Sequence, residues 1–235
     1  MKLIIFGSTG MIGQAVIKEA LLASNVEAIT LVNRSPAQIK HAKITKFLVT
    51  DLFDLSSLKD HLGDYDACIF CIGVSAAFMD EHAYTKLTYD LTMSVAHTLF
   101  RANPGLVFVY ITGQGTDSTE SGARMWARVK GKTENALLKL PFKAAYMFRP
   151  GAILPLDGIR SKAKLYDMLY LALTPLVQLV RLINPAWIPT TSDIGRAMLA
   201  AAEGKSAKLI LNNQDIVELA ASHKVQGQKI IPEKD

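Results

Sequence analysis

The chain has 235 residues, of which 50% are apolar and 20% are charged, and its formal net charge at pH 7 is +5. These values are typical of one globular domain with a large core. The mild positive charge is spread along the chain, which argues against nucleic acid as a partner, and the histidines lack a metal-binding spacing. Because Lys2 to Phe6 already has the pattern of a strand rather than of a leader peptide, we expect a cytoplasmic protein.

The first predicted elements are a strand over 2–6 and a helix over 11–23, joined by a glycine-rich turn. The unbroken apolar run before the turn is typical of a strand buried on both faces of a parallel sheet. Glycines spaced G-x-x-G-x-x-G permit a tight turn and let backbone approach a diphosphate, which the start of the helix attracts through its free N–H groups. A purely structural turn is the alternative. The predicted dinucleotide-binding residues are Gly7, Ser8, Thr9, Gly10, Met11, Ile12 and Gly13.

The second predicted strand, 28–33, ends where a dinucleotide site usually carries an acidic residue for the ribose 2′-hydroxyl. Asn33 occupies that position and Arg34 follows it. Because a guanidinium can hold a 2′-phosphate through charge-assisted hydrogen bonds, we predict that both residues contact the cofactor. The predicted cofactor is therefore NADP(H), with NAD(H) as the alternative. An arginine that only caps a surface turn is the other interpretation of Arg34.

Two more strands are predicted over 44–49 and 66–72. Ligands of open α/β sheets bind beyond the carboxyl ends of the strands, so the residues after both strands border the same groove. A carboxylate there can accept a hydrogen bond from the adenine amino group, although a simple loop role for Asp51 is equally consistent. The residues predicted to contact the cofactor are Asp51, Leu52, Cys71 and Gly73.

Cys68 and Cys71 form a C-x-x-C pattern within the strand predicted over 66–72. Residues three apart on a strand point to opposite faces. A redox pair needs a helix N-terminus and a zinc site needs two further ligands. We therefore expect both cysteines to be core residues.

Strands and helices continue to alternate to residue 148. The remaining predictions are a helix over 81–102, a strand over 106–112, a helix over 122–140 and a strand over 143–148. This alternation predicts an α/β fold with a doubly wound parallel sheet. We expect a single domain over 1–235, in which 152–190 forms a small subregion on the substrate side.

An apolar stripe at helical spacing runs from Leu165 to Ile183. Polar and charged residues interrupt it, so no transmembrane segment is predicted. We expect the stripe to pack against the substrate side or at a subunit contact, with a peripheral membrane contact as the minor alternative. The polar tail from His223 to Asp235 is expected to fray.

Five stretches together resemble the short-chain dehydrogenase/reductase superfamily. They are Gly7–Gly13, Cys71–Gly73, Leu106–Thr112, Val129–Glu134 and Phe148–Gly151. More narrowly, the chain is similar over almost its whole length to the atypical subgroup with NmrA-like and Tat-interacting-protein-like oxidoreductases. The resemblance implies a Rossmann-type NAD(P)-binding fold, and it places Arg149 and Pro150 beside the cofactor and substrate, although Arg149 as an ordinary surface residue is the alternative.

The resemblance also implies a catalytic Tyr-x-x-x-Lys on the helix, with a hydroxyl residue at the end of the preceding strand. Lys130 matches the lysine and Thr112 matches the hydroxyl residue, but Trp126 occupies the tyrosine position. An indole donates a hydrogen bond but does not titrate near neutrality. We expect an NADP(H)-dependent oxidoreductase that acts on a small carbonyl or alcohol, its proton coming from Thr112, water or the substrate. The alternative is an NADP(H)-sensing regulatory module with little or no turnover.

Overall fold

The computed structural model describes residues 1–156, 158 and 184–223. Within these residues the central feature is a seven-stranded sheet of order β3-β2-β1-β4-β5-β6-β7, in which all neighbouring strands are parallel. The strands are β1 (Lys2–Phe6), β2 (Ala28–Asn33), β3 (Ile44–Leu48), β4 (Ala67–Phe70), β5 (Val107–Ile111), β6 (Ala144–Phe148) and β7 (Ile210–Leu211). The expected doubly wound parallel sheet of an α/β fold is thereby confirmed.

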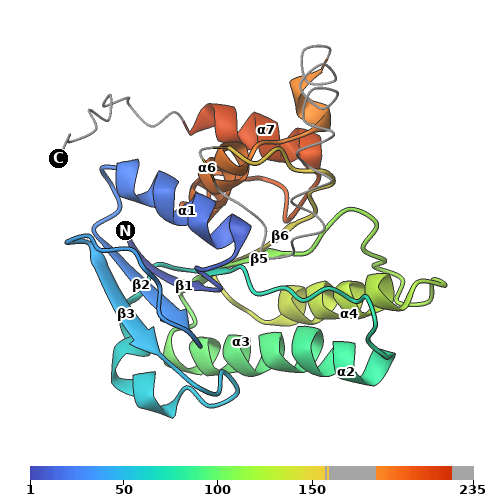
Figure 1. The fold of residues 1–235 in the computed structure, drawn as a ribbon, viewed down its shortest axis with the longest axis horizontal. Helices are drawn as coiled ribbons and strands as arrows, with labels where there is room; N and C mark the ends of the chain where they lie inside the picture. The colour runs from blue at the N-terminus through green and yellow to red at the C-terminus, as the bar shows by residue number, and fades with distance from the viewer. Residues whose placement is uncertain (157, 159–183, 224–235) are drawn as a thin grey trace.

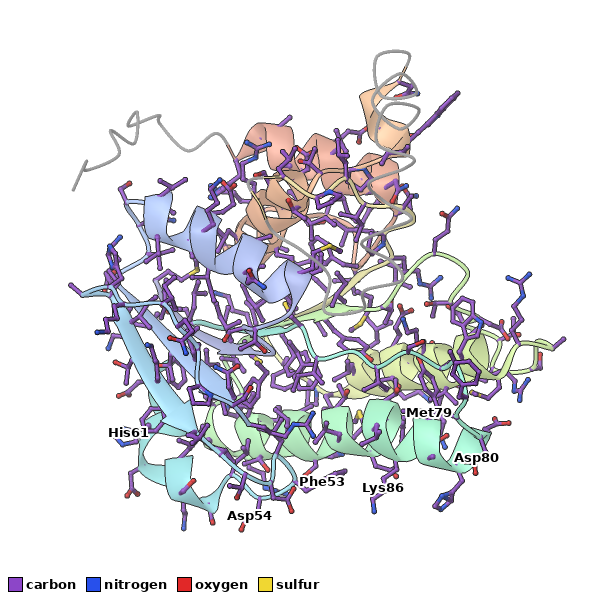
Figure 2. All side chains as sticks on the ribbon, viewed as in Figure 1. Phe53, Asp54, His61, Met79, Asp80 and Lys86 are labelled. Carbon is purple, nitrogen blue, oxygen red and sulfur yellow. The ribbon has the colours of Figure 1, made fainter. Side chains whose placement is uncertain are left out.

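Helices cover both faces of the sheet (Figure 1). On one face lie α1 (Met11–Leu22), α6 (Thr191–Ala202) and α7 (Asn213–Ser222), and on the other lie η1 (Ser56–Asp64), α3 (Leu91–Ala102) and α4 (Met125–Lys139). Because successive side chains of a strand point to opposite faces, Leu3 and Ile5 enter the first core, and Ile4 and Phe6 enter the second. Figure 2 shows side chains filling the space between sheet and helices, whereas Lys86 lies at the outer surface.

The helix expected over 81–102 is present but contains one wide turn. Its parts are α2 (Glu81–Thr85), a π-helical turn η2 (Lys86–Asp90) and α3. Next to this turn, the hydroxyl of Thr92 donates to the carbonyl oxygen of Thr88 over 2.6 Å. Side-chain bonds of this kind compete with the regular helical ladder, and π-helical turns are frequent at functional sites.

Two predicted elements are shorter than expected by three residues or more. The strand expected over 66–72 ends at Phe70. Just beyond it, the backbone of Gly7 lies so close to that of Cys71 that a Cβ on Gly7 would be 2.8 Å from the Cys71 carbonyl carbon. The helix expected over 122–140 begins only at Met125. The Asp117 carboxylate accepts a hydrogen bond from the Gly122 amide over 2.7 Å and holds that segment in a loop.

After residue 190 the chain forms α6, β7 and α7, which the sequence analysis did not predict. Both helices begin at capping boxes, made by Thr190 with Asp193 and by Asn212 with Asp215, and this pattern is a sequence signal for a helix start. The stripe 165–183, the tail beyond His223 and most of 152–190 lie outside the described residues. None of the described helices combines the length and the hydropathy that a membrane span requires.

The order of the strands in the sheet indicates where the ligand crevice lies. The chain moves from β1 outward through β2 to β3 and then returns to β4 on the other side of β1. In open α/β sheets the crevice between two such oppositely directed halves is the usual ligand site. The glycine turn after β1 and the segment after β4 therefore lie at that crevice.

Candidate cofactor cleft and active site

The three glycines of the turn have different surroundings. Gly7 has a positive φ of +78°, and a Cβ on Gly13 would overlap the Gly7 carbonyl oxygen and lie 2.7 Å from the Ser8 Cα atom. These two glycines are required by the fold itself. Gly10 differs, because a Cβ there would meet only the Gly7 oxygen at 3.4 Å. The turn therefore leaves open space above Gly10.

Gly10 is also the N-cap of α1, and it provides no side-chain cap. The first turn of α1 contains no acidic residue either. The N–H groups of that turn are thus available to a bound anion, which the positive end of the helix dipole also attracts. Gly73 adds a second open position across the crevice, since a Cβ there would meet no atom of the described residues within 4 Å.

A cavity of about 400 Å³ extends from this turn to the end of β2. Its lining includes Gly7, Thr9, Gly10, Asn33, Arg34, Leu52, Cys71 and Gly73. Ser8 donates a buried hydrogen bond of 2.9 Å to the Asn33 Oδ1 atom, so these two side chains fix the turn against β2. Arg34 has no carboxylate partner among the described residues.

Asp51 is placed differently from Leu52. Its carboxylate accepts a hydrogen bond of 2.9 Å from the Phe53 amide, and it does not line the cavity. The structure therefore brings Leu52, but not the Asp51 side chain, to the cleft.

A second cavity of about 480 Å³ adjoins the first and shares Gly10, Cys71 and Gly73 with it. Thr112, Lys130 and Pro150 line it, as do the phenols of Tyr84 and Tyr110. The Lys130 ammonium donates to the Thr112 carbonyl oxygen over 2.7 Å. Burial lowers the pKa of Lys130 from its usual value, and the nearby Glu134 carboxylate partly opposes that shift.

Trp126 lies one helical turn before Lys130, whose ammonium is 5.9 Å from the indole ring centroid. The indole does not line the second cavity. It packs instead against the turn at Gly115, where a Cβ would lie 3.2 Å from the indole Cη2 atom. The structure thus places Thr112 and Lys130 in one cavity and Trp126 beside it.

The Thr112 hydroxyl belongs to a buried polar network that the sequence analysis missed. It donates to the Glu134 carboxylate over 2.5 Å, and Glu134 is fully buried. The Arg149 Nε atom contacts both oxygens of that carboxylate at 3.1 and 2.9 Å, and its Nη2 atom donates to Ser118 over 2.5 Å. The helical spacing of Glu134, four residues after Lys130, is the only sequence signal for this network. Arg149 therefore lies behind the second cavity rather than in its lining.

Arg149→Met is expected to lower the free energy of unfolding by roughly 3–5 kcal/mol, because it leaves the Glu134 charge buried without its partner. Urea unfolding of the purified variant measures this loss. Arg128→Met is the matched control, since Arg128 pairs with Glu81 at an exposed site and such pairs contribute about 0–1 kcal/mol. Similar small losses in both variants would contradict the structural role of Arg149.

The two cysteines are free thiols that pack among core residues. Cys68 is buried in the second core, and Cys71 packs against the first. Burial raises the pKa of Cys68 well above its usual value and that of Cys71 to about 12. Neither thiol is therefore an activated nucleophile near neutral pH.

The sequence profile of a family described as NAD(P)H-binding matches residues 7–136. This range includes the glycine turn, Cys71 and Gly73, which line both cavities, and Lys130. Among curated proteins, the chain is 28% identical to the protein fmp52-2, mitochondrial, of Aspergillus oryzae, over 92% of this chain and 95% of that protein. It is 26% identical to the protein of the same name from Aspergillus terreus, over 84% and 85% of the two chains. These names contradict the expected cytoplasmic location, which is therefore wrong.

Solved structures with the same fold are more distant in sequence. The UDP-glucuronic acid 4-epimerase of Bacillus cereus, solved with NAD, has a TM-score of 0.64 and 13% identity, over 90% of this chain and 76% of that chain. WbmH of Bordetella bronchiseptica, solved with NAD⁺, has a TM-score of 0.63 and 13% identity, over 90% and 74%. This similarity agrees with the Rossmann-type fold expected from the sequence.

Proposed function

The chain belongs to the NAD(P)H-binding family, and we propose that it is an NADP(H)-dependent oxidoreductase acting on a small carbonyl or alcohol substrate. As an oxidoreductase-type NAD(P)-binding protein it fits the atypical short-chain dehydrogenases/reductases that its sequence resembles. The observation that carries the proposal is the placement of Lys130 and Thr112 in a cavity that adjoins the open turn at Gly10. The names of its relatives favour a mitochondrial location for this chain.

The residues of the crevice fit a dinucleotide. The uncapped start of α1 and the open position at Gly10 suit the diphosphate. The cavity at Asn33 and Arg34 suits the adenosine half, and the cavity at Lys130 suits the nicotinamide half. The bound cofactor supplies or accepts the hydride.

The proton chemistry depends on the groups around Thr112. The Thr112 hydroxyl has two acceptors within hydrogen-bond distance, the Glu134 carboxylate at 2.5 Å and the Phe148 carbonyl oxygen at 3.0 Å. Because its single proton is engaged by one of them, only its lone pairs are available to a ligand. Thr112 then orients the hydroxyl of an alcohol substrate by accepting its hydrogen bond, whereas a carbonyl oxygen only accepts and receives no hydrogen bond from Thr112. Lys130 holds the cofactor ribose. The proton comes from water or from a further group, since Trp126 has no titratable proton near neutrality.

Arg34→Ala is expected to weaken NADPH binding by roughly tenfold to a hundredfold, because a charge-assisted hydrogen bond contributes about 1.5–3 kcal/mol. NADH binding should change little, since NADH lacks the 2′-phosphate. Calorimetric titration of both cofactors measures the difference, with Arg101→Ala, on the exposed end of α3, as the control. Equal affinity of the unmodified protein for NADPH and NADH would contradict the NADP(H) assignment.

A regulatory, NADP(H)-sensing protein is the second candidate function. One observation favours it: the tyrosine position holds Trp126, whose indole packs outside the cavity that contains Lys130. Such a protein would bind the cofactor with the same turn and show little or no turnover.

A further inference from the structure

A third cavity of about 460 Å³ lies at the carboxyl ends of β5, β6 and β7, beside the proposed active site. Gly151 lies between the Lys130 cavity and the third cavity. It lines the Lys130 cavity, and its amide donates to the Oδ1 atom of Asn213, which lines the third, over 2.8 Å. A Cβ on Gly151 would overlap the Gln114 Oε1 atom, so the Gln114 side chain lies directly against this glycine. A ligand in the third cavity would thus be a neighbour of one in the active site.

The lining of this cavity is neutral. Among the residues that the structure describes, Arg149 is its single charged member, and the buried Glu134 carboxylate pairs with that guanidinium. The start of α7 is not an anion site either, because the Asn212 Oδ1 atom caps the amides of Gln214 and Asp215. An ionic ligand therefore finds no uncompensated charge on the described residues of this cavity.

The lining nevertheless offers hydrogen bonds from separate segments. Within the part of the chain that the structure describes, the Gln114 side chain makes no hydrogen bond, and the Nδ2 atom of Asn212 and the Oε1 atom of Gln214 also remain free. Asn213 is fully engaged, since its Nδ2 atom donates to the Trp187 carbonyl oxygen over 2.6 Å. The free amides both donate and accept, and they come from the loop after β5 and from the start of α7.

An aromatic surface completes the cavity. Trp187 ends the short helix η3 (Pro185–Trp187), lines the cavity and is 57% exposed. An indole with an open face can stack on the C–H face of a ring, while amides bind hydroxyl groups that both donate and accept. A nucleobase would also stack, but it presents hydrogen-bonding groups in one plane, whereas the hydroxyls of a sugar point in several directions.

We propose that the cavity between Gln114, Trp187 and the start of α7 binds the ring of a neutral sugar, which is the substrate or part of it. The assignment as substrate rests on the proposed oxidoreductase function. A secondary hydroxyl of the ring, or the corresponding ketone, is then the group presented to Thr112 and Lys130.

The test is a titration of the full chain with D-glucose, D-galactose and N-acetyl-D-glucosamine, followed by tryptophan fluorescence and by saturation-transfer NMR. We expect at least one sugar to bind with a Kd on the order of 1 mM, because so small a ligand has a low limit on its affinity. Trp187→Leu and Gln114→Ala should each weaken binding about tenfold. Gln38→Ala, far from this cavity in the loop after β2, should leave it unchanged.

Calorimetry with NADPH on the same samples separates the two proposals. Binding of NADPH without binding of any of the three sugars would overturn the sugar site and leave the proposed function standing. Sugar binding without NADPH binding would support the site and contradict the oxidoreductase. Sugar binding that survives both Trp187→Leu and Gln114→Ala, or tighter binding of adenosine at Trp187, would also overturn the proposal.

Discussion

Gly10→Val is expected to abolish NADPH binding while leaving the fold in place. Among the atoms of the described residues, a Cβ at Gly10 meets only the Gly7 oxygen, at 3.4 Å. The extended backbone at this N-cap, with φ −81° and ψ 166°, is open to any residue. The added methyl groups would fill the space that the diphosphate needs. Because valine is a poor N-cap, the free energy of unfolding should fall by only about 1 kcal/mol.

Gly13→Ala is the matched control, since it should destabilise the fold instead of filling the space for the diphosphate. Its Cβ would lie 2.7 Å from the Ser8 Cα atom, so the turn must shift and the melting temperature should fall clearly. Circular dichroism and calorimetric titration of both variants separate the two roles. A folded Gly10→Val protein that still binds NADPH normally would show that this turn holds no dinucleotide.

The sheet and the glycine turn were predictable because both depend on local sequence. Buried parallel strands such as β1 and β4 are continuous apolar runs, and their alternation with helices favours a parallel arrangement joined by right-handed crossovers. The pairing of Thr112 with Lys130 was expected only from the resemblance to the short-chain dehydrogenase/reductase superfamily, and in the structure the Lys130 ammonium donates to the Thr112 carbonyl oxygen.

The Glu134 network was not predictable, because its bonds join residues 15 to 31 positions apart. A threonine at a strand end has the same pattern whether its hydroxyl faces a ligand or a buried carboxylate. The Asp51 side chain shows the same limit, since a carboxylate after a strand can equally accept from the backbone two residues later, as it does here. Helices α6 and α7 were missed although their capping boxes are visible in the sequence.

Trp126→Tyr is expected to raise NADPH-dependent turnover of generic aldehydes or quinones, if the protein is a reductase with an altered proton donor. Residues four apart share one helix face, so the new phenol would lie beside Lys130, whose ammonium is now 5.9 Å from the indole centroid. That cation lowers the phenol pKa toward working pH, and general acid catalysis contributes about 10²–10⁴-fold. Steady-state consumption of NADPH measures the gain.

The pH dependence of the rate identifies the donor. A phenol that gives its proton to the substrate oxygen acts only when protonated, so the gain should be lost as pH rises through the phenol pKa. Trp126→Phe is the control for loss of the indole and should show no gain, and adding Lys130→Ala to the tyrosine variant should remove it. A tyrosine variant slower than the unmodified protein would mean that another group already supplies the proton. Tight NADPH binding by all variants without turnover of any carbonyl would instead support the regulatory function, in which the cavity at Lys130 and Thr112 binds the cofactor without a proton donor at position 126.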